Sequence, residues 1–308
     1  MIALGIDIGG TKIAAGLVTV EGTVLARVEA PTPATEGQDR ILGIVEELGR
    51  RLIDGYDGDR RDIVALGVGS GGVIDPELRR VVASTDFMGD WKGAEIGARL
   101  ESTFGLPVVV YNDVHAHAAG EAFFGAGRGQ RIALVAGIGT GIGGAVLIDG
   151  VPQLGAHGAA GHVGHISTAE ALGMPCPCGR TGHLESISSG TGLLALYRKL
   201  GGDPSVRNAR EIVARLDEDT IAHTALVTSA SSLGTGLADL ANVVDPHIVI
   251  VAGGMSNAGP LWWESLLGAF NGGLLPILEG TPLVKAHLGD DAAIVGAAKL
   301  ALEQLQRG

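Results

Sequence analysis

The sequence has 308 residues, of which 46% are hydrophobic, so it can bury a substantial core and is not disordered in its main state. A single core stops growing at roughly 250–300 residues, and we therefore expect two lobes. The formal net charge is −12 at pH 7. Because an acidic surface repels phosphate backbones, this charge argues against a nucleic-acid partner.

Cysteine usage and apolar segments indicate the cellular setting. The two cysteines, Cys176 and Cys178, are too few for a disulfide framework and favour a reducing compartment, so we expect a cytoplasmic protein. Residues 1–7 lack the basic start of a signal peptide and predict a buried strand. No uninterrupted apolar run reaches the roughly 18 residues of a membrane span, so we expect no membrane partner.

The first 124 residues alternate between strand and helix patterns. Residues 2–8 form an apolar run, and the apolar residues of 39–54 recur on one helical face. The predicted elements, in chain order, are strands at 2–8, 13–20 and 23–29, a helix at 39–54, a strand at 63–69, a helix at 92–103, a strand at 107–111 and a helix at 114–124.

Residues 131–150 resemble a second start. With an offset of 128 residues, Gly-Leu-Val at 16–18 aligns with Gly-Ala-Val at 144–146, and Glu-Gly at 21–22 aligns with Asp-Gly at 149–150. Both stretches predict a strand, a glycine turn, a second strand and an acidic-glycine hairpin. We interpret this as a weak internal repeat that begins the second lobe. The alternative is that any two glycine-rich hairpins look alike.

The second half begins with an irregular His-, Gly- and Cys-rich segment at 155–183. A helical pattern then runs over 184–244, with a break at 201–204. The remaining predicted elements are a strand at 247–251, a helix near 260–270, a strand near 283–287 and a helix at 291–305. Strands that alternate with helices indicate an α/β fold whose sheets are covered on both faces.

Three glycine-rich turns stand at strand ends, at residues 7–12, 139–144 and 252–256. Glycine lets backbone N–H groups approach an oxyanion, while Thr and Lys add donors and positive charge for phosphate. None of the turns matches the Walker or the Rossmann pattern. Because the first two join strand to strand, we expect phosphate to be held between two β-hairpins, one from each lobe.

Six motifs follow one another along the whole chain. They are Asp-Ile-Gly-Gly-Thr-Lys at 7–12, Asn-Asp-Val-His-Ala at 112–116 with Ala-Gly-Glu at 119–121, Gly-Thr-Gly-Ile-Gly-Gly at 139–144, Gly-His at 164–165, Cys-x-Cys-Gly-x-x-Gly-His-x-Glu at 176–185 and Ala-Gly-Gly-Met-Ser at 252–256. In this order they resemble the motifs of the ROK family (repressors, open reading frames and kinases), a glucokinase-like branch of the actin-like ATPase superfamily.

The resemblance implies an α/β fold of two ribonuclease-H-like lobes around a central cleft. A sugar-side lobe would comprise residues 1–112, completed by a C-terminal helix at 291–308, and a nucleotide-side lobe would comprise residues 113–290. The resemblance also implies ATP and Mg²⁺, a small-molecule sugar as acceptor, and a homodimer. ATP is the expected donor, although some relatives use polyphosphate.

Asp113 is the expected catalytic base, because a carboxylate can accept the proton of a sugar hydroxyl as the phosphoryl group arrives. The neighbouring Asn112 can donate to and accept from other sugar hydroxyls. Gly71 resembles the family glycine whose backbone meets the sugar, but Ser70 stands where the family often has proline, so this loop is less rigid. The alternative is that Asn112 and Asp113 only cap the following helix.

The resemblance places the nucleotide and its phosphates on the glycine turns. Asp7 is expected to orient magnesium-bound water or the phosphates, the alternative being a simple turn aspartate. The other expected contacts are Gly9, Gly10, Thr11, Lys12, Gly139, Thr140, Gly141, Gly253 and Gly254.

A His/Cys cluster is the candidate site of a structural zinc ion. The resemblance implies one His and three Cys as ligands, and His183 replaces the third cysteine here. Two His and two Cys remain a suitable tetrahedral set, so the expected ligands are His165, Cys176, Cys178 and His183. The alternative is that this replacement has abolished the metal site.

The resemblance further implies that His165 and Glu185 face the sugar, together with the residue three positions before His165. That residue is normally glutamate, and here it is His162. An imidazole can donate or accept where a carboxylate only accepts. Glucose therefore competes with amino sugars such as kanosamine and with C7-cyclitols as the expected acceptor, unless His162 is only a repositioned loop residue.

We expect an ATP-dependent sugar kinase that phosphorylates the primary 6-hydroxyl of a hexose or hexose-like substrate. A sugar-responsive transcriptional repressor is a remote alternative, because such repressors carry an additional N-terminal helix-turn-helix, whereas the phosphate hairpin here starts at residue 2 and the protein is acidic. A catalytically idle sugar-binding protein is disfavoured, because Asp7, Asp113 and both glycine hairpins are present.

Overall fold

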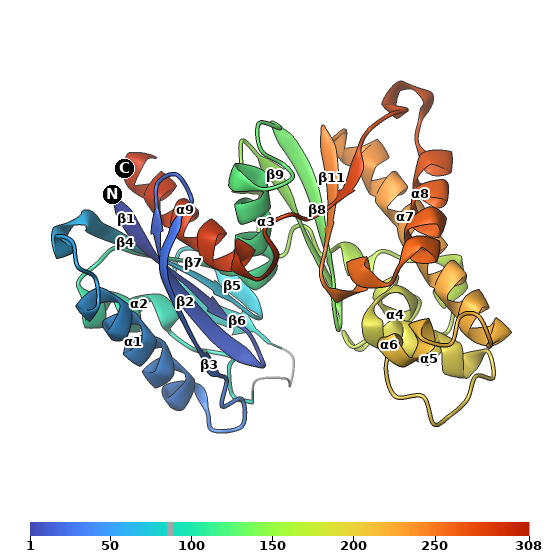
Figure 1. The fold of residues 1–308 in the computed structure, drawn as a ribbon, viewed down its shortest axis with the longest axis horizontal. Coiled ribbons are helices and arrows are strands. Elements are labelled where there is room, and N and C mark those ends of the chain that lie inside the picture. Colours follow the sequence, from blue (N-terminus) through green and yellow to red (C-terminus); the bar gives the residue numbers. More distant parts are fainter. Residues whose placement is uncertain (85–88, 308) are drawn as a thin grey trace. The chain divides into compact units, whose positions relative to one another are not determined.

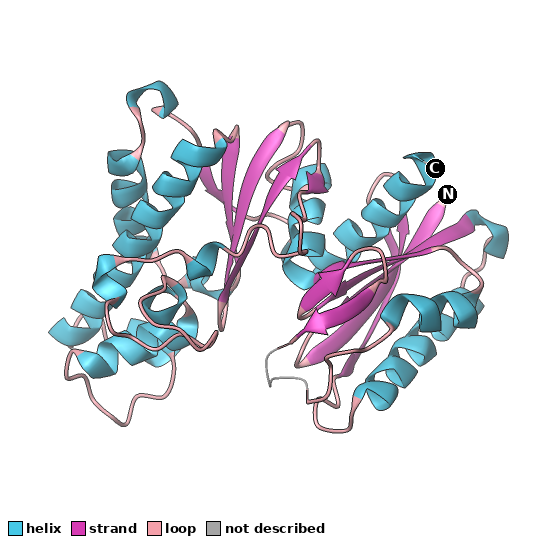
Figure 2. Ribbon diagram, turned by 180° about the vertical axis from the view of Figure 1, so that it is seen from behind, coloured by secondary structure: helices cyan, strands magenta, loops and turns pink. Residues whose placement is uncertain are grey.

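The computed structural model describes residues 1–84 and 89–307, which fold into a mixed α/β structure (Figures 1 and 2). Contacts divide the chain into two compact units. The first unit comprises Met1–Gly129, Leu147–Ala160 and His287–Gly308, and the second comprises Gln130–Val146 and Gly161–Ala286. Gly308, the last residue of the expected 291–308 helix, lies outside the described residues.

The chain forms two five-stranded sheets whose strand orders correspond. The first has the order β3-β2-β1-β4-β7, and the second has the order β10-β9-β8-β11-β12. In the first sheet, β4 pairs in parallel with β1 and β7, and in the second, β11 pairs in parallel with β8 and β12. The matching orders support the internal repeat, since Gly16 and Gly144 lie on corresponding strands, β2 and β9.

The strands of the two sheets agree closely with the predicted ones. Those of the first sheet are β1 (Ile2–Ile8), β2 (Lys12–Thr19), β3 (Val24–Pro31), β4 (Ile63–Ser70) and β7 (Val108–Asn112). Those of the second are β8 (Ile132–Ile138), β9 (Ile142–Ile148), β10 (Val151–Pro152), β11 (Ile248–Ala252) and β12 (Leu283–Lys285). Three short strands were not predicted: β10, and the pair β5 (Val73–Asp75) and β6 (Arg80–Ala83), which forms a two-stranded sheet.

Successive side chains along each strand point to opposite faces of the first sheet, and these two faces differ. Ile2, Leu4, Ile6 and Ile8 of β1 join the core under α1 (Gln38–Asp54) and α2 (Ile96–Phe104). Small residues occupy the other face, against α9 (Ala292–Arg307). A methyl group added at Gly67 would lie 1.8 Å from the Ala297 carbonyl oxygen. Glycine is therefore needed for the close approach of α9 that Figure 1 shows.

The helix that follows β7, α3 (Asp113–Phe124), packs against α9 with equally little space. A methyl group at Gly120 would lie 2.2 Å from the Ala292 carbonyl oxygen, and one at Gly296 would lie 1.8 Å from the Ala116 carbonyl oxygen. This packing groups α3 with the first unit, which continues to Gly129. The grouping differs from the expected boundary between residues 112 and 113, because helix α3 is fixed by its partner helix rather than by its chain neighbours.

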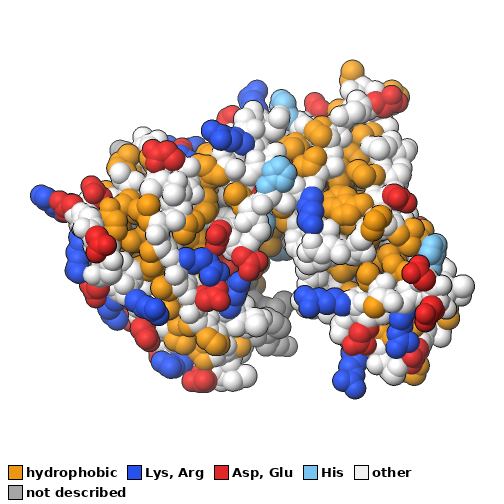
Figure 3. Space-filling view, in the orientation of Figure 1, with side chains coloured by type: hydrophobic (Ala, Val, Ile, Leu, Met, Phe, Trp, Pro, Cys, Tyr) orange, Lys and Arg blue, Asp and Glu red, His pale blue; other side chains and the backbone are white. Residues whose placement is uncertain are grey.

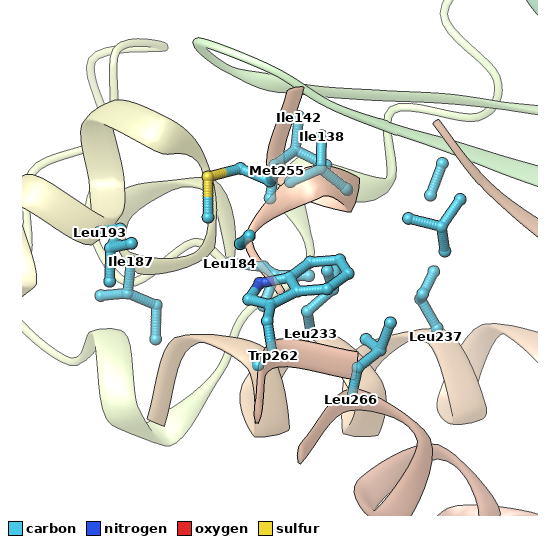
Figure 4. Close-up of a cluster of buried hydrophobic side chains, with 14 of the residues drawn as sticks. Ile138, Ile142, Leu184, Ile187, Leu193, Leu233, Leu237, Met255, Trp262 and Leu266 are labelled. Atoms are coloured by element: carbon cyan, nitrogen blue, oxygen red, sulfur yellow. The ribbon is translucent and has the colours of Figure 1, made fainter. Parts of the chain in front are cut away.

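The second unit has its own apolar core, which Figure 4 shows around Trp262. Two long helices contribute to it, α7 (Thr220–Val244) and α8 (Pro260–Gly273), which lie against each other. The predicted helical region of 184–244 contains α4 (Glu185–Ser188), α5 (Gly190–Lys199), α6 (Ala209–Val213) and α7. Its predicted break is confirmed, since no helix covers 201–204 in this described stretch.

The surface carries charges of both signs. On the face in Figure 3, Lys and Arg side chains are interspersed with Asp and Glu side chains. Among the described residues, no helix is both long and apolar enough to cross a bilayer.

Candidate active site

Asp113 begins α3 at the carboxyl end of β7. The Asn112 side chain caps this helix: its Oδ1 accepts a hydrogen bond from the Val114 N–H at 3.0 Å. Its Nδ2 donates to the Gly72 carbonyl oxygen at 2.8 Å, which ties the helix start to the loop that contains Gly71. Asn112 is therefore the N-cap residue, and Asp113 is the first helical residue, whose Oδ1 also accepts from the Val114 N–H at 2.9 Å.

Two carboxylates influence each other at this end of the first sheet. Burial raises the pKa of Asp113 above its ordinary value. Burial also raises the pKa of Asp7 to about 7, with the Asp113 charge as the next contribution and Lys12 acting in the opposite direction. Two desolvated carboxylates resist simultaneous ionisation unless a cation compensates them. Asp7 therefore suits a site that holds a hydrated divalent cation.

Lys12 is held by an acidic residue that the sequence reasoning missed. Its Nζ lies 2.8 Å from Oδ2 of Asp290, and 4.0 Å from Oε2 of Glu29. Lys12 and Asp290 are 278 positions apart, so no local pattern could pair them. The turn itself is closed by the Gly9 N–H, which donates to the Lys12 carbonyl oxygen at 3.0 Å.

The loop at Gly71 is also fixed by side chains that were not predicted. The Gly71 N–H donates to the Ile8 carbonyl oxygen at 3.3 Å, at the end of β1. Buried Trp91 donates from Nε1 to Oγ of Ser70 at 3.1 Å. Ser70, which stands at the position where proline was expected, therefore holds the loop by a buried hydrogen bond.

The other two glycine turns lie next to each other in the second unit, because they follow the adjacent parallel strands β8 and β11. Gly253 has φ +87°, and a methyl group there would lie 2.5 Å from the Ile138 carbonyl oxygen, so only glycine fits. Next to it, a methyl group at Gly254 would meet no heavy atom within 4 Å. In the turn at 139–144, the Gly139 N–H donates to the Gly141 carbonyl oxygen at 2.9 Å, and this hydrogen bond closes the turn.

Glu185 fixes the turn at 139–144. Its Oε2 accepts from the Ile142 N–H at 2.6 Å, and a methyl group at Gly141 would lie 2.7 Å from the same oxygen. The side chain of Thr191 adds a second link by donating to the Thr140 carbonyl oxygen at 2.7 Å. Glu185 therefore connects this turn to the His/Cys segment described next.

The four expected metal ligands converge. One ligand atom from each of His165, Cys176, Cys178 and His183 lies within 4.8 Å of all the others. The Cys176 Sγ to His165 Nδ1 distance is 3.7 Å, and the Cys178 Sγ to His183 Nδ1 distance is 3.3 Å. Zn–S and Zn–N bonds of about 2.3 and 2.0–2.1 Å place tetrahedral ligand atoms roughly 3.4–3.8 Å apart. The residues therefore fit zinc, and His183 can fill the fourth position.

The protonation state of the cysteine ligands depends on whether a metal ion is bound. Burial raises the pKa of Cys176 to about 11, although the backbone N–H of Cys178 acts in the opposite direction, so the thiol is protonated without a cation. Metal binding would displace that proton, since thiolate is the ligand form. Burial lowers the pKa of His165 and keeps its imidazole neutral, as a metal ligand requires.

His162 stacks on the cluster. Its ring centroid lies 5.9 Å from that of His165, with an angle of 20° between the planes. His162, which replaces the expected glutamate, therefore packs against His165, a proposed metal ligand. The structure brings His162, His165 and Glu185 into one segment of the second unit, and Asp7, Asn112 and Asp113 into one region of the first.

Comparisons with known proteins show the family to which this chain is similar. The model of the ROK family matches residues 3–304. The chain is similar to a glucokinase of Streptomyces coelicolor, with 34% identity over 98% of both chains. It is also similar to an N-acetylmannosamine kinase of Escherichia coli, with 32% identity over 98% of both. The crystal structure of a ROK family glucokinase from Streptomyces griseus with glucose and AMPPNP superposes with a TM-score of 0.80 at 31% identity, covering 98% of this chain and all of that one.

Proposed function

Because the chain belongs to the ROK family, we propose that it is an ATP-dependent sugar kinase that phosphorylates the 6-hydroxyl of a hexose. The observation that carries this proposal is the pair of interacting carboxylates, Asp7 and Asp113, at the end of the first sheet. A phosphoryl transfer to an alcohol needs one group to accept a proton and another to help hold the metal-bound phosphates.

We assign the proton transfer to Asp113. The sugar O6–H bond breaks, its proton goes to the carboxylate of Asp113, and O6 forms a bond to the γ-phosphorus as the bond to the ADP oxygen breaks. The raised pKa of Asp113 suits a base that must accept this proton. Asn112 holds the start of α3 and so fixes the direction of the neighbouring carboxylate.

The glycine turns are the proposed phosphate and nucleotide contacts. In the second unit these are Gly139, Thr140 and Gly141, with the open space at Gly254 leaving room beside Gly253. In the first unit they are the backbone and side chains of residues 9–12, where Lys12 already faces an anion, Asp290. Mg²⁺, when bound near Asp7, would neutralise charge on the transferred phosphoryl group.

Zinc has a structural role in this proposal. The ion would hold the segment that carries His165, and Glu185 extends this support to the 139–144 turn through its bond to Ile142. His162, His165 and Glu185 are the proposed sugar contacts of the second unit, and Gly71, Asn112 and Asp113 those of the first.

For the acceptor we propose glucose or an amino hexose such as kanosamine, with a C7-cyclitol as the alternative. The similarity to both a glucokinase and an N-acetylmannosamine kinase supports hexoses of both kinds. His162 favours a substituted ring, because imidazole accommodates a donor or an acceptor where a carboxylate requires donors. We also propose a homodimer in the cytoplasm, which light scattering and fractionation can test.

A coupled ADP-release assay over hexoses, amino sugars and cyclitols tests the proposal. We expect sugar-dependent ADP release with at least one hexose, and Mg²⁺ should be required. Asp113→Asn, prepared in parallel, controls for contaminating kinases. ADP release that does not depend on any sugar, or that survives in the variant, would contradict the proposal. A repressor would show sugar binding without turnover.

A further inference from the structure

Glu121 is a buried carboxylate two turns along α3 from Asp113, and the proposed reaction does not use it. Its exposed fraction is 0%. Oε1 accepts from the N–H groups of His287 at 2.9 Å and Leu288 at 2.7 Å. Oε2 accepts from the N–H groups of Ala126 at 2.9 Å and His287 at 3.0 Å. The charge of this carboxylate is thus balanced by three backbone amides.

These amides belong to two of the four segments that connect the first unit to the second. The chain first leaves the first unit after Gly129, three residues beyond Ala126, and after a passage through it at 147–160 it returns for the last time at His287. His287 and Leu288 then lead into α9, which begins at Ala292. One carboxylate therefore holds the first-unit ends of two connections that are more than 150 positions apart in sequence.

The Glu121 carboxylate occupies the space beside Gly125. A methyl group at Gly125 would lie 2.1 Å from Oε2 of Glu121, so glycine at 125 provides the space that the carboxylate fills.

We propose that Glu121 is a positioning residue that fixes both connections to the helix carrying Asp113. By fixing the connection at His287 and Leu288, Glu121 would also help to position the first phosphate turn. Asp290, two residues beyond Leu288, holds the ammonium group of Lys12 in that turn at 2.8 Å. This inference rests on the proposed kinase function where it concerns turnover, since Lys12 and Asp113 are proposed to act in that reaction. Its structural part is independent of that function.

Glu121→Gln gives the sharpest variant. A glutamine has one accepting oxygen, so whichever way its amide turns, its NH₂ group faces an N–H of one of the two connections. Hydrogen exchange measured by mass spectrometry should show faster exchange in peptides containing 125–130 or 286–289, by about tenfold, the scale of one hydrogen bond to a charged group. Peptides of β1 and β4 should keep their protection.

Gly125→Ala is a second variant that leaves the charge of Glu121 in place but displaces its carboxylate. It separates positioning from electrostatics, because Glu121→Gln also changes the field at His117, whose pKa is lowered by burial against the opposing effect of the Glu121 charge. We expect both variants to lower kcat about tenfold, with a smaller change in the KM for the sugar. If only the lost charge of Glu121 mattered, kcat would fall in Glu121→Gln and would not fall in Gly125→Ala.

Asp219→Asn is the matched control. Asp219 accepts from the N–H groups of Ile221 and Ala222 at 2.8 and 3.1 Å at the start of α7, away from both connections. It should lower the melting temperature without lowering the kcat of the folded enzyme. Unchanged exchange of both connections in Glu121→Gln, or kcat losses as large in Asp219→Asn, would overturn the proposal. If no sugar is phosphorylated at all, the exchange experiment still decides the positioning role.

Discussion

Asp7 shows how one buried group makes stability depend on pH. The pKa of its carboxyl group is about 7 in the folded protein, compared with an ordinary value of 3.8. Between these values the folded state binds more protons than the unfolded state, so the stability that Asp7 contributes is present at low pH and is lost as the pH rises towards 7. We expect Asp7→Asn to be more stable than the wild type at high pH.

Urea unfolding of both proteins, without nucleotide or sugar, measures this effect. The free energy of unfolding of the variant relative to the wild type should increase by roughly 2–3 kcal/mol between about pH 5 and pH 7.5, at about 1.4 kcal/mol per unit. A difference that stays constant over this range would show that Asp7 titrates near its ordinary value.

His162 is the residue from which we predict a change in specificity. His162→Glu restores the carboxylate of the family pattern and should shift kcat/KM towards glucose over an amino hexose by roughly 1–3 kcal/mol, the scale of one hydrogen-bonding group in a site. The measurement is kcat/KM for both sugars in both proteins. Equal ratios would mean that His162 does not contact the substrate.

At the scale of elements, the spacing between the first sheet and α9 depends on glycine. Gly67→Ala places a methyl group 1.8 Å from the Ala297 carbonyl oxygen, and overpacking of this kind costs typically about 1–3 kcal/mol or more. Gly43→Ala is its control, because a methyl group there, in α1, meets no heavy atom within 4 Å. It should stabilise the helix by up to about 1 kcal/mol. Equal melting temperatures for the two variants would refute this packing.

The loop between His165 and His183 should contain about one zinc ion per chain. We expect His183→Ala to lose the metal, while His157→Ala, an exposed histidine outside the four ligands, keeps it. Metal analysis of protein purified without chelators gives the zinc content. Wild-type protein free of zinc, with this loop still ordered, would show that the replacement of cysteine by His183 had abolished the site.

The long elements could be predicted from the sequence because their periodicity is local. Strands β1 and β4 are continuous apolar runs, and α1 has a clear apolar face. The short strands β5, β6 and β10, of two to four residues, contain no measurable period. The grouping of α3 with α9 depends on contacts of Gly120 and Gly296, which no local pattern relates.

The site could likewise be predicted where its signal is local, but not where it depends on contacts between distant segments. The motifs pointed to the two carboxylates and to four candidate metal ligands, whose ligand atoms converge. They did not reveal the partner of Lys12, or that Glu121 holds backbone amides of distant segments. Both contacts join parts of the chain that meet only after folding.

At the scale of the whole molecule, two sheets of the same order carry the glycine turns at corresponding places. The first turn joins β1 to β2, and the second joins β8 to β9. The glycine turns of these two hairpins are the proposed phosphate contacts, and the first hairpin also supplies Asp7, while α3 of the same unit supplies Asp113. Both carboxylates therefore belong to the first unit.

The most direct test is the product that the purified protein makes from Mg·ATP and its best hexose, followed by ³¹P NMR. We predict ADP and a sugar phosphate whose phosphorus couples to the two methylene protons of C6. Asp113→Asn should remain folded, with its melting transition preserved, and form this product about 10²-fold more slowly. Phosphate on another hydroxyl, or near-wild-type turnover in the variant, would contradict the account.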